Sequence, residues 1–226
     1  MKKIFTIILG CLLATSLVAC NSTDDQEDTC NPKIVKEENN ISDSGKILVV
    51  YFSMPETTDP NNMSEEEENS AIVVDGEVLG NTQYVAQVIH ENTDSELFRI
   101  EPSVPYPTDH DTLVDQAANE QDENYRPEIK DTIQDFDQYD TIFVGYPNWW
   151  GDMPMILYSL FDDYDFSDKT IVPFNTHGGS GFSNTMETIT ELEPDATVIT
   201  DGFTVSRDNV DTSEEDIIQW LKDLGF

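Results

Sequence analysis

The chain has 226 residues, and 38% of them are hydrophobic, which is enough for one globular domain with tails. Its formal net charge of -35 excludes nucleic acid as a partner, because the phosphate backbone would repel the protein. The same acidity disfavours negative charge on any bound redox group.

The N-terminal segment is typical of a targeting signal. Lys2 and Lys3 precede a mostly apolar stretch, residues 4–18, which is short for a membrane span. The sequence Leu17-Val18-Ala19-Cys20 then resembles the bacterial lipobox. We expect removal of residues 1–19, lipid attachment at Cys20, and a protein anchored to the bacterial cell membrane outside the cytoplasm. The alternative is an ordinary secretory signal with an incidental cysteine.

Residues 20–44 are rich in Asp, Glu, Asn, Ser and Thr, and they are predicted to form a flexible acidic tether. Only Cys30 would remain there unmodified, so no disulfide framework is available. The folded domain is predicted to span residues 45–226.

The first half of this domain begins with a β-branched, apolar run at residues 47–52, which is typical of a buried parallel strand. Residues 54–79 are interpreted as an insertion, with a hairpin possible at Asp75-Gly76. Its acidic run, residues 65–68, lacks the Asp/Asn-Gly pattern of a calcium loop, and no metal site is predicted. A helix to about residue 91, a strand at 97–100 and a helix capped by Thr108 or Asp109 follow.

The second half continues the alternation. Strands are predicted at residues 141–145, 169–174 and 197–199, the last resuming at 203–205, with helices between them. Thr212 and Glu215 have capping-box spacing before the last helix. Strand-helix alternation of this kind predicts one open parallel sheet with helices on both faces and no second domain.

Three loops follow the carboxyl ends of these strands, where open α/β sheets bind ligands. The first joins Ser53 to Gly80-Asn81-Thr82 and supplies hydroxyls and backbone amides for an anion. The second, residues 146–151, carries two tryptophans. The third, residues 176–182, is glycine-rich, which lets backbone approach a ligand. Together these loops predict a site for a flat ring that carries a monophosphate.

Each loop also has a plainer interpretation. Gly-Asn-Thr alone is more often a turn or a helix cap, and the tryptophans could pack on a neighbouring loop or a partner protein. Neither GxxxxGK[ST] nor GxGxxG occurs, so a triphosphate loop and a dinucleotide fingerprint are both unsupported.

In combination, the motifs resemble the flavodoxin family, and more closely its members with a Trp-Trp turn. The resemblance covers about residues 45–226 and implies a flavodoxin-like three-layer α/β sandwich, with a five-stranded parallel sheet of order 2-1-3-4-5. It also implies flavin mononucleotide (FMN) as cofactor. The residues that match the family's phosphate loop are Ser53, Gly80, Asn81 and Thr82. Those that match the loops flanking the ring are Tyr146, Pro147, Asn148, Trp149, Trp150, Gly151, Thr176, His177, Gly178, Gly179, Ser180, Gly181 and Phe182.

The sequence departs from the family at residues 54–79. There Met54-Pro55-Glu56 follows Ser53, whereas the family's phosphate loop is usually continuous. One expected hydroxyl is therefore missing from its place. A long insertion adds little closure entropy if its two ends meet.

The leading prediction is a low-potential, FMN-binding electron-transfer protein whose redox partner is an unknown protein or a small quinone. One alternative is an FMN-dependent quinone or NAD(P)H oxidoreductase, with His177 or Tyr146 as a catalytic proton donor. A loop histidine bonded to backbone or solvent is the plainer interpretation of His177. Another alternative is a non-redox binding lipoprotein of the same fold.

Overall fold

The structure, a computed structural model, describes residues 45–226. The predicted signal, Cys20 and the predicted tether lie outside the described residues. In the part that is described, no helix combines the length and the hydrophobicity that crossing a membrane requires.

The domain is built on a parallel sheet whose central strands are β1 (Lys46–Tyr51) and β5 (Tyr139–Pro147). β4 (Ser95–Arg99) pairs with the outer side of β1, and β6 (Thr170–His177) pairs with the outer side of β5. The sheet order is therefore β4-β1-β5-β6, and the predicted fold class is confirmed.

The position beside β6 is divided, at the residues where the predicted fifth strand stops and resumes, but the strand count differs from the predicted five. Two short strands share it, β7 (Thr197–Val198) and β8 (Phe203–Ser206), so the sheet has six strands and its order is not simply 2-1-3-4-5. The interruption lies beside Pro173 of β6, which has no N–H to donate to a neighbouring strand. Gly202 lies against the Pro173 carbonyl, where a side chain would not fit.

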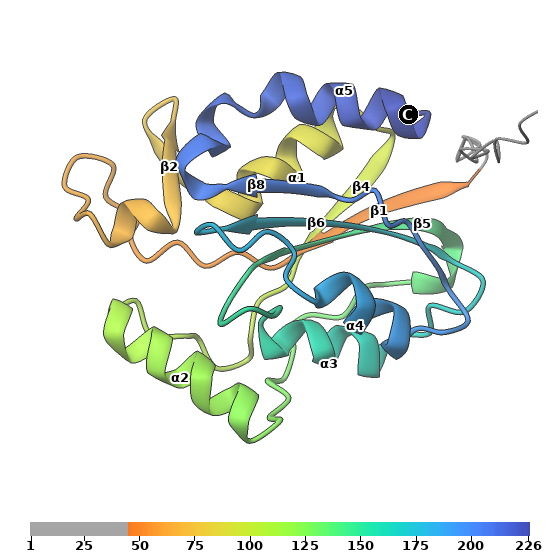
Figure 1. The fold of residues 1–226 in the computed structure, drawn as a ribbon, viewed down its shortest axis with the longest axis horizontal. Coiled ribbons are helices and arrows are strands. Elements are labelled where there is room, and N and C mark those ends of the chain that lie inside the picture. Colours follow the sequence, from red (N-terminus) through yellow and green to blue (C-terminus); the bar gives the residue numbers. More distant parts are fainter. Residues whose placement is uncertain (1–44) are drawn as a thin grey trace, which may run out of the picture. The chain divides into compact units, whose positions relative to one another are not determined.

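Helices cover both faces of the sheet (Figure 1). α1 (Asn81–Glu91) and α5 (Glu214–Leu224) lie on one face, and α3 (Met155–Asp163) and α4 (Thr185–Leu192) lie on the other. β1 serves both cores because its side chains alternate. Leu48 and Val50, followed by Phe52 just after the strand, enter the α3 side, while Ile47, Val49 and Tyr51 enter the α1 side.

The predicted N-terminal caps of two helices have different outcomes in the structure. α2 (His110–Asp122) begins as predicted, with the Asp109 carboxylate accepting a hydrogen bond from the Thr112 amide at 3.1 Å. The predicted Thr212–Glu215 capping box is wrong. Thr212 ends a 3-10 helix, η3 (Arg207–Thr212), and its hydroxyl donates to the Asn209 carbonyl. A further short 3-10 helix, η2 (Phe136–Gln138), precedes β5.

The insertion is ordered and projects beside the carboxyl edge of the sheet (Figure 1). It contains η1 (Glu67–Asn69) and the hairpin of β2 (Ala71–Val74) with β3 (Glu77–Gly80). Asp75 and Gly76 form the turn with φ of 51° and 85°, so the predicted hairpin is confirmed.

Candidate functional site

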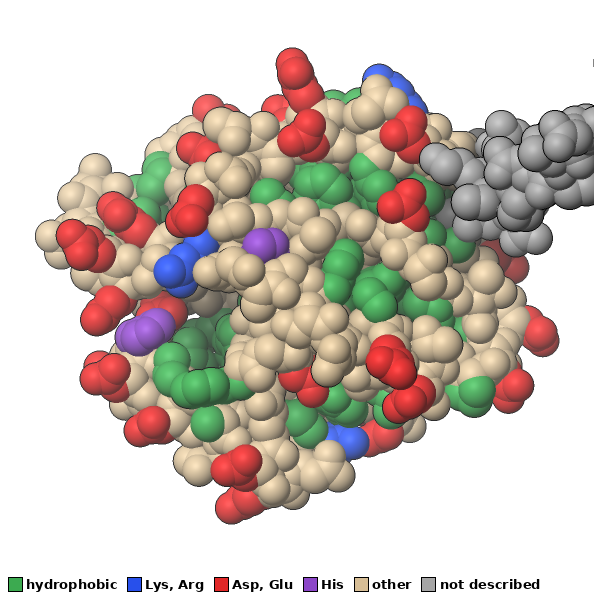
Figure 2. Space-filling model, viewed as in Figure 1, with side chains coloured by type: hydrophobic (Ala, Val, Ile, Leu, Met, Phe, Trp, Pro, Cys, Tyr) green, Lys and Arg blue, Asp and Glu red, His purple; other side chains and the backbone are tan. Residues whose placement is uncertain are grey.

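A cleft of about 240 Å³ opens at the carboxyl edge of the sheet. Figure 2 shows a hollow on the visible face, with hydrophobic side chains inside and histidine, Lys or Arg on its rim. The predicted site residues that line the cleft are Ser53, Asn81, Thr82, Pro147, Asn148, Trp149, Trp150, Thr176, His177 and Gly178.

Hydrogen bonds join the three predicted loops around this cleft. The hydroxyls of Thr82 and Thr176 are 2.9 Å apart, which links the first turn of α1 to the end of β6. The Asn148 amide donates to the Thr176 carbonyl at 2.8 Å, and Asn148 Nδ2 donates to the Gly181 carbonyl at 2.9 Å. The loops were predicted to converge because parallel strands end at one edge, and the structure brings them together.

The other predicted residues lie around the cleft without lining it. Tyr146 is fully buried, and its hydroxyl donates to Thr185 at 2.6 Å. Burial raises the Tyr146 pKa, so this phenol stays protonated inside the core. Gly80 packs so closely that a Cβ would collide with Ser53 Oγ. The remainder of this set is Gly151, Gly179, Ser180, Gly181 and Phe182.

The tryptophan turn is a tight reversal. Trp149 and Asp152 exchange two backbone hydrogen bonds of 2.8 and 3.0 Å around Trp150 and Gly151, whose φ angles are 54° and 80°. A bulky residue at positive φ is strained by about 1–3 kcal/mol. Trp150 is nevertheless 63% exposed. An apolar ring held out in a strained conformation points to a role in binding.

Trp149 has a different environment. Its ring meets Phe52 and Tyr106 edge-on, at centroid distances of 5.5 and 5.6 Å. α2 holds the same turn, because Gln121 Nε2 donates to the Trp149 carbonyl and Trp150 Nε1 donates to the Val114 carbonyl. Trp149 is thus part of the packing, and Trp150 presents the exposed ring.

The insertion occupies several donors at the start of α1. The Asn81 amide donates to the Ser70 carbonyl at 3.0 Å, and Asn81 Nδ2 donates to the Asn69 carbonyl at 2.9 Å. The Gly80 amide is also engaged, because it donates to Gln83 Oε1 of α1 itself at 3.4 Å. Asn81 Oδ1 is left as a buried acceptor without a partner among the described residues, although it borders the cleft. An unpaired buried acceptor of this kind favours a ligand hydroxyl or water there.

His177 presents a defined donor to the cleft. The Gly179 amide donates to His177 Nδ1 at 2.8 Å, so the neutral ring carries its proton on Nε2. Burial lowers the His177 pKa, which favours this neutral form at pH 7. The side chain can therefore donate a hydrogen bond through Nε2.

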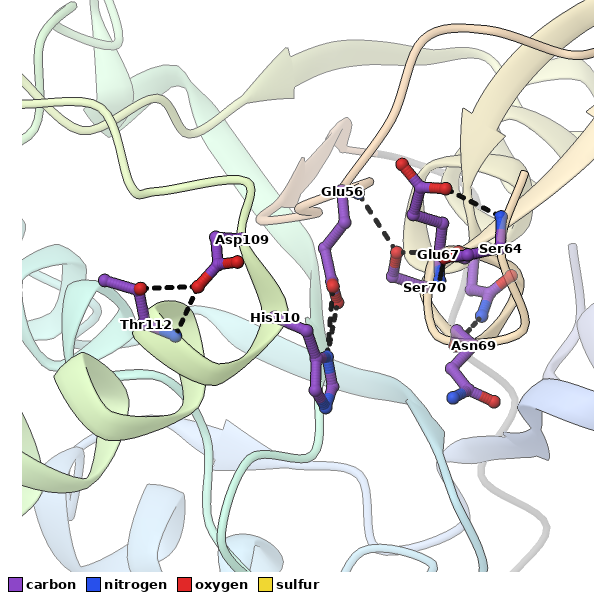
Figure 3. A network of polar contacts seen from close by, with 9 residues as sticks. Glu56, Ser64, Glu67, Asn69, Ser70, Asp109, His110 and Thr112 are labelled. Atoms are coloured by element: carbon purple, nitrogen blue, oxygen red, sulfur yellow. Dashed lines mark hydrogen bonds and ion pairs between the residues drawn. The ribbon is translucent and has the colours of Figure 1, made fainter. Parts of the chain in front are cut away.

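Glu56 and His110 form a pair that the sequence analysis missed. Glu56 comes from the insertion and His110 from the first turn of α2, and their side chains meet at 3.0 Å beside the cleft (Figure 3). Burial raises the Glu56 pKa, and the hydrogen bond from His110 offsets part of that rise. Glu56 lies five residues after the end of β1, but only the docking of α2 reveals its partner.

Further cleft residues were also missed. Leu113, Val114 and Ala117 supply an apolar wall from α2, and Met54, Asn69 and Ser70 come from the insertion. Arg207 reaches the cleft from the start of η3. It lies two residues after the strand predicted at residues 203–205, so the carboxyl-edge rule applied to that strand would have found it.

The cleft lies where the chain order reverses, between β1 and β5, and this arrangement defines a flavodoxin-like α/β protein. The chain belongs to the flavodoxin family, whose model matches residues 70–224. No curated protein gives a significant match to the chain.

Solved structures agree on the fold. A candidate flavoprotein from Bacteroides eggerthii is 26% identical, with a TM-score of 0.60 over 80% of this chain and 98% of its own. A similar protein from Bacteroides uniformis is 25% identical, with a TM-score of 0.60 over 79% and 98%. A Lactobacillus acidophilus flavoprotein, solved in complex with FMN, is 23% identical with a TM-score of 0.52 over 74% and 97%, and shows the likeness of fold.

Proposed function

We propose that this protein binds FMN and transfers electrons, anchored by a lipid on Cys20 outside the cytoplasm. The observation that carries the proposal concerns Trp150 at the switch-point cleft of a flavodoxin-family chain. Its backbone is strained at positive φ, and its ring is exposed. Family membership and the relative solved with FMN support the cofactor.

The residues present fit FMN. Trp150, with the apolar residues of α2, offers a wall for a flat ring. The unpaired Asn81 Oδ1 is an acceptor, which suits a hydroxyl of the ribityl chain. Ser53 and Thr82 border the cleft with hydroxyls. Trp150, Asn148 and His177 would hold the ring, Asn81 the ribityl chain, and Ser53 and Thr82 the phosphate end.

FMN, when bound, supplies one- and two-electron chemistry, and the protein sets its binding and potential. Trp150, as a wall of the cleft, would exclude water from one side of the ring. His177 offers a hydrogen bond through Nε2. The acidic field of the chain and an aromatic wall both disfavour added negative charge, which predicts a low potential.

A redox titration of the FMN-loaded protein tests electron transfer at low potential. The expected result is a hydroquinone couple below that of free FMN. A couple at or above the free value would contradict the predicted low-potential carrier.

A second candidate function is a quinone or NAD(P)H oxidoreductase. The specific observation in its favour is the His177 Nε2–H donor at the cleft. Steady-state turnover of a quinone with NADPH separates the two functions. Sustained turnover that falls in His177→Phe supports the enzyme, whereas its absence in a loaded, reducible protein supports the carrier.

The lipid anchor rests on the Leu17-Val18-Ala19-Cys20 pattern. Expression in a bacterium with labelled fatty acid should label the wild type and place it in the membrane fraction. Cys20→Ser should abolish the label. Equal labelling of both would contradict lipidation at Cys20.

A further inference from the structure

Arg207 is a cleft residue to which the flavin loops give no role. It follows β8, whose last residue, Ser206, is in register with His177 of β6. Both therefore lie at the carboxyl edge, where α1 also begins. Arg207 lines the same cleft as Asn81 and Thr82. Its guanidinium lies over Gly178, where a Cβ would come within 3.3 Å of Nη1.

The guanidinium of Arg207 has no close ion-pair partner within residues 45–226. Its guanidinium makes no hydrogen bond there, and its nearest carboxylate is Asp208, at 4.0 Å and 81% exposed. An ion pair this long and this exposed is worth little. Arg126, in contrast, binds Asp162 at 2.7 Å, and Arg99 donates to the Ser53 carbonyl at 3.1 Å.

At the phosphate end of the cleft, meanwhile, the insertion takes two donors of Asn81. Insertion residues Asn69 and Ser70 accept from the side-chain and backbone N–H groups of Asn81. Glu56 adds a carboxylate to the cleft, in contact with His110 at 3.0 Å. In a chain of net charge -35, a dianion entering this cleft needs a compensating cation nearby.

We infer that Arg207 binds the phosphate monoester of the cofactor, in place of the donors taken by the insertion. The inference rests on the proposed FMN binding and adds a charged specificity determinant to it. A guanidinium can give two parallel N–H···O bonds to a phosphate, and such charge-assisted bonds are strong. Arg207 should thus make the protein select FMN over riboflavin, which lacks the phosphate.

The test compares the dissociation constants of FMN and riboflavin for the purified apoprotein, by quenching of flavin fluorescence. Variants are Arg207→Gln and Arg207→Lys, with Arg126→Gln as a matched control outside the cleft. Melting curves establish that each variant is folded. Repeating the titrations in about 0.5 M salt checks whether the FMN preference is electrostatic.

We expect Arg207→Gln to weaken FMN binding about tenfold or more while leaving riboflavin within about twofold. Arg207→Lys should retain part of the preference, and Arg126→Gln all of it. The inference is overturned if Arg207→Gln weakens the binding of FMN and riboflavin equally, or weakens the binding of neither. If Arg207→Gln does not fold, the lysine variant decides, since it should lose affinity for FMN alone. A wild type that binds neither flavin refutes the proposed function, and this inference with it.

Discussion

Trp150 is the residue in which local strain and exposure coincide. Its backbone is left-handed, a conformation that glycine adopts freely and that a bulky side chain resists. The indole is fixed by its hydrogen bond to the Val114 carbonyl at 3.1 Å, which leaves its area uncovered by protein. Strain and exposure at one residue support the proposed binding role of Trp150.

Trp150→Ala should weaken FMN binding roughly three- to tenfold, because one aromatic contact contributes on the order of 1 kcal/mol. The melting temperature should change little. Trp149→Ala should instead lower the melting temperature, because that ring packs on Phe52 and Tyr106. Tyr125→Ala, which removes another exposed ring, is the matched control. Unchanged FMN affinity in Trp150→Ala would assign the turn to a partner interface.

Glu193 gives a pH-dependent prediction at the end of α4. Burial, followed by the charges of Asp165 and Asp162, raises its pKa to about 7. Because its native pKa lies above its unfolded value, the wild type loses stability as the pH rises from about 4.5 through 7.

Glu193→Gln removes that loss. The variant should be more stable than the wild type at pH 8, by less than about 1 kcal/mol since the site is partly exposed. The gain should shrink toward pH 5. Urea unfolding at both pH values measures it, with exposed Glu191→Gln as control. A gain that is larger at pH 5 would contradict the assignment.

At the scale of elements, the insertion acts as a second wall of the cleft. It contributes Glu56, Asn69 and Ser70, and it meets α2 through the Glu56–His110 pair (Figure 3). The pair joins segments 54 residues apart in sequence. It therefore ties a loop region to a helix across the entrance to the site.

His110→Ala should release this tie. Amide hydrogen exchange in residues 54–80 should quicken up to about fivefold, the effect of losing a part-exposed pair worth about 1 kcal/mol or less. Exchange in β5 should not change. Asp109→Ala, which removes the α2 cap, is the contrasting variant and should loosen α2 first. An insertion unaffected by His110→Ala would show that the pair is not a tie.

The elements also show what could be predicted from the sequence. The strands were predictable because their apolar runs are continuous, and the carboxyl-edge rule then brought Thr82, Asn148 and Thr176 together. The break in the fifth strand was also predicted, from the apolar residues at 197–199 and 203–205. Its position beside Pro173 was not predictable, because Pro173 belongs to a neighbouring strand. The Glu56–His110 pair and the α2 wall depend on how α2 packs against the rest of the domain. The periodicity of the sequence does not indicate that packing.

For the whole molecule, the central contrast is between the acidic surface and the cleft. The chain carries a net charge of -35, yet the cleft in residues 45–226 holds the guanidinium of Arg207 beside one carboxylate, Glu56, which is paired with His110. A guanidinium at the cleft of an acidic protein suits a phosphate-bearing ligand at one end. The acidic surroundings still disfavour added negative charge on a bound ring.

The most direct measurement is a titration of the purified protein with FMN, followed by flavin absorbance and fluorescence. The account predicts saturable binding of one FMN per chain, with strong quenching by the adjacent tryptophan, and loss of that quenching in Trp150→Ala. A correctly folded protein that stays flavin-free in about millimolar FMN, equivalent to binding weaker than about 4 kcal/mol, would contradict it.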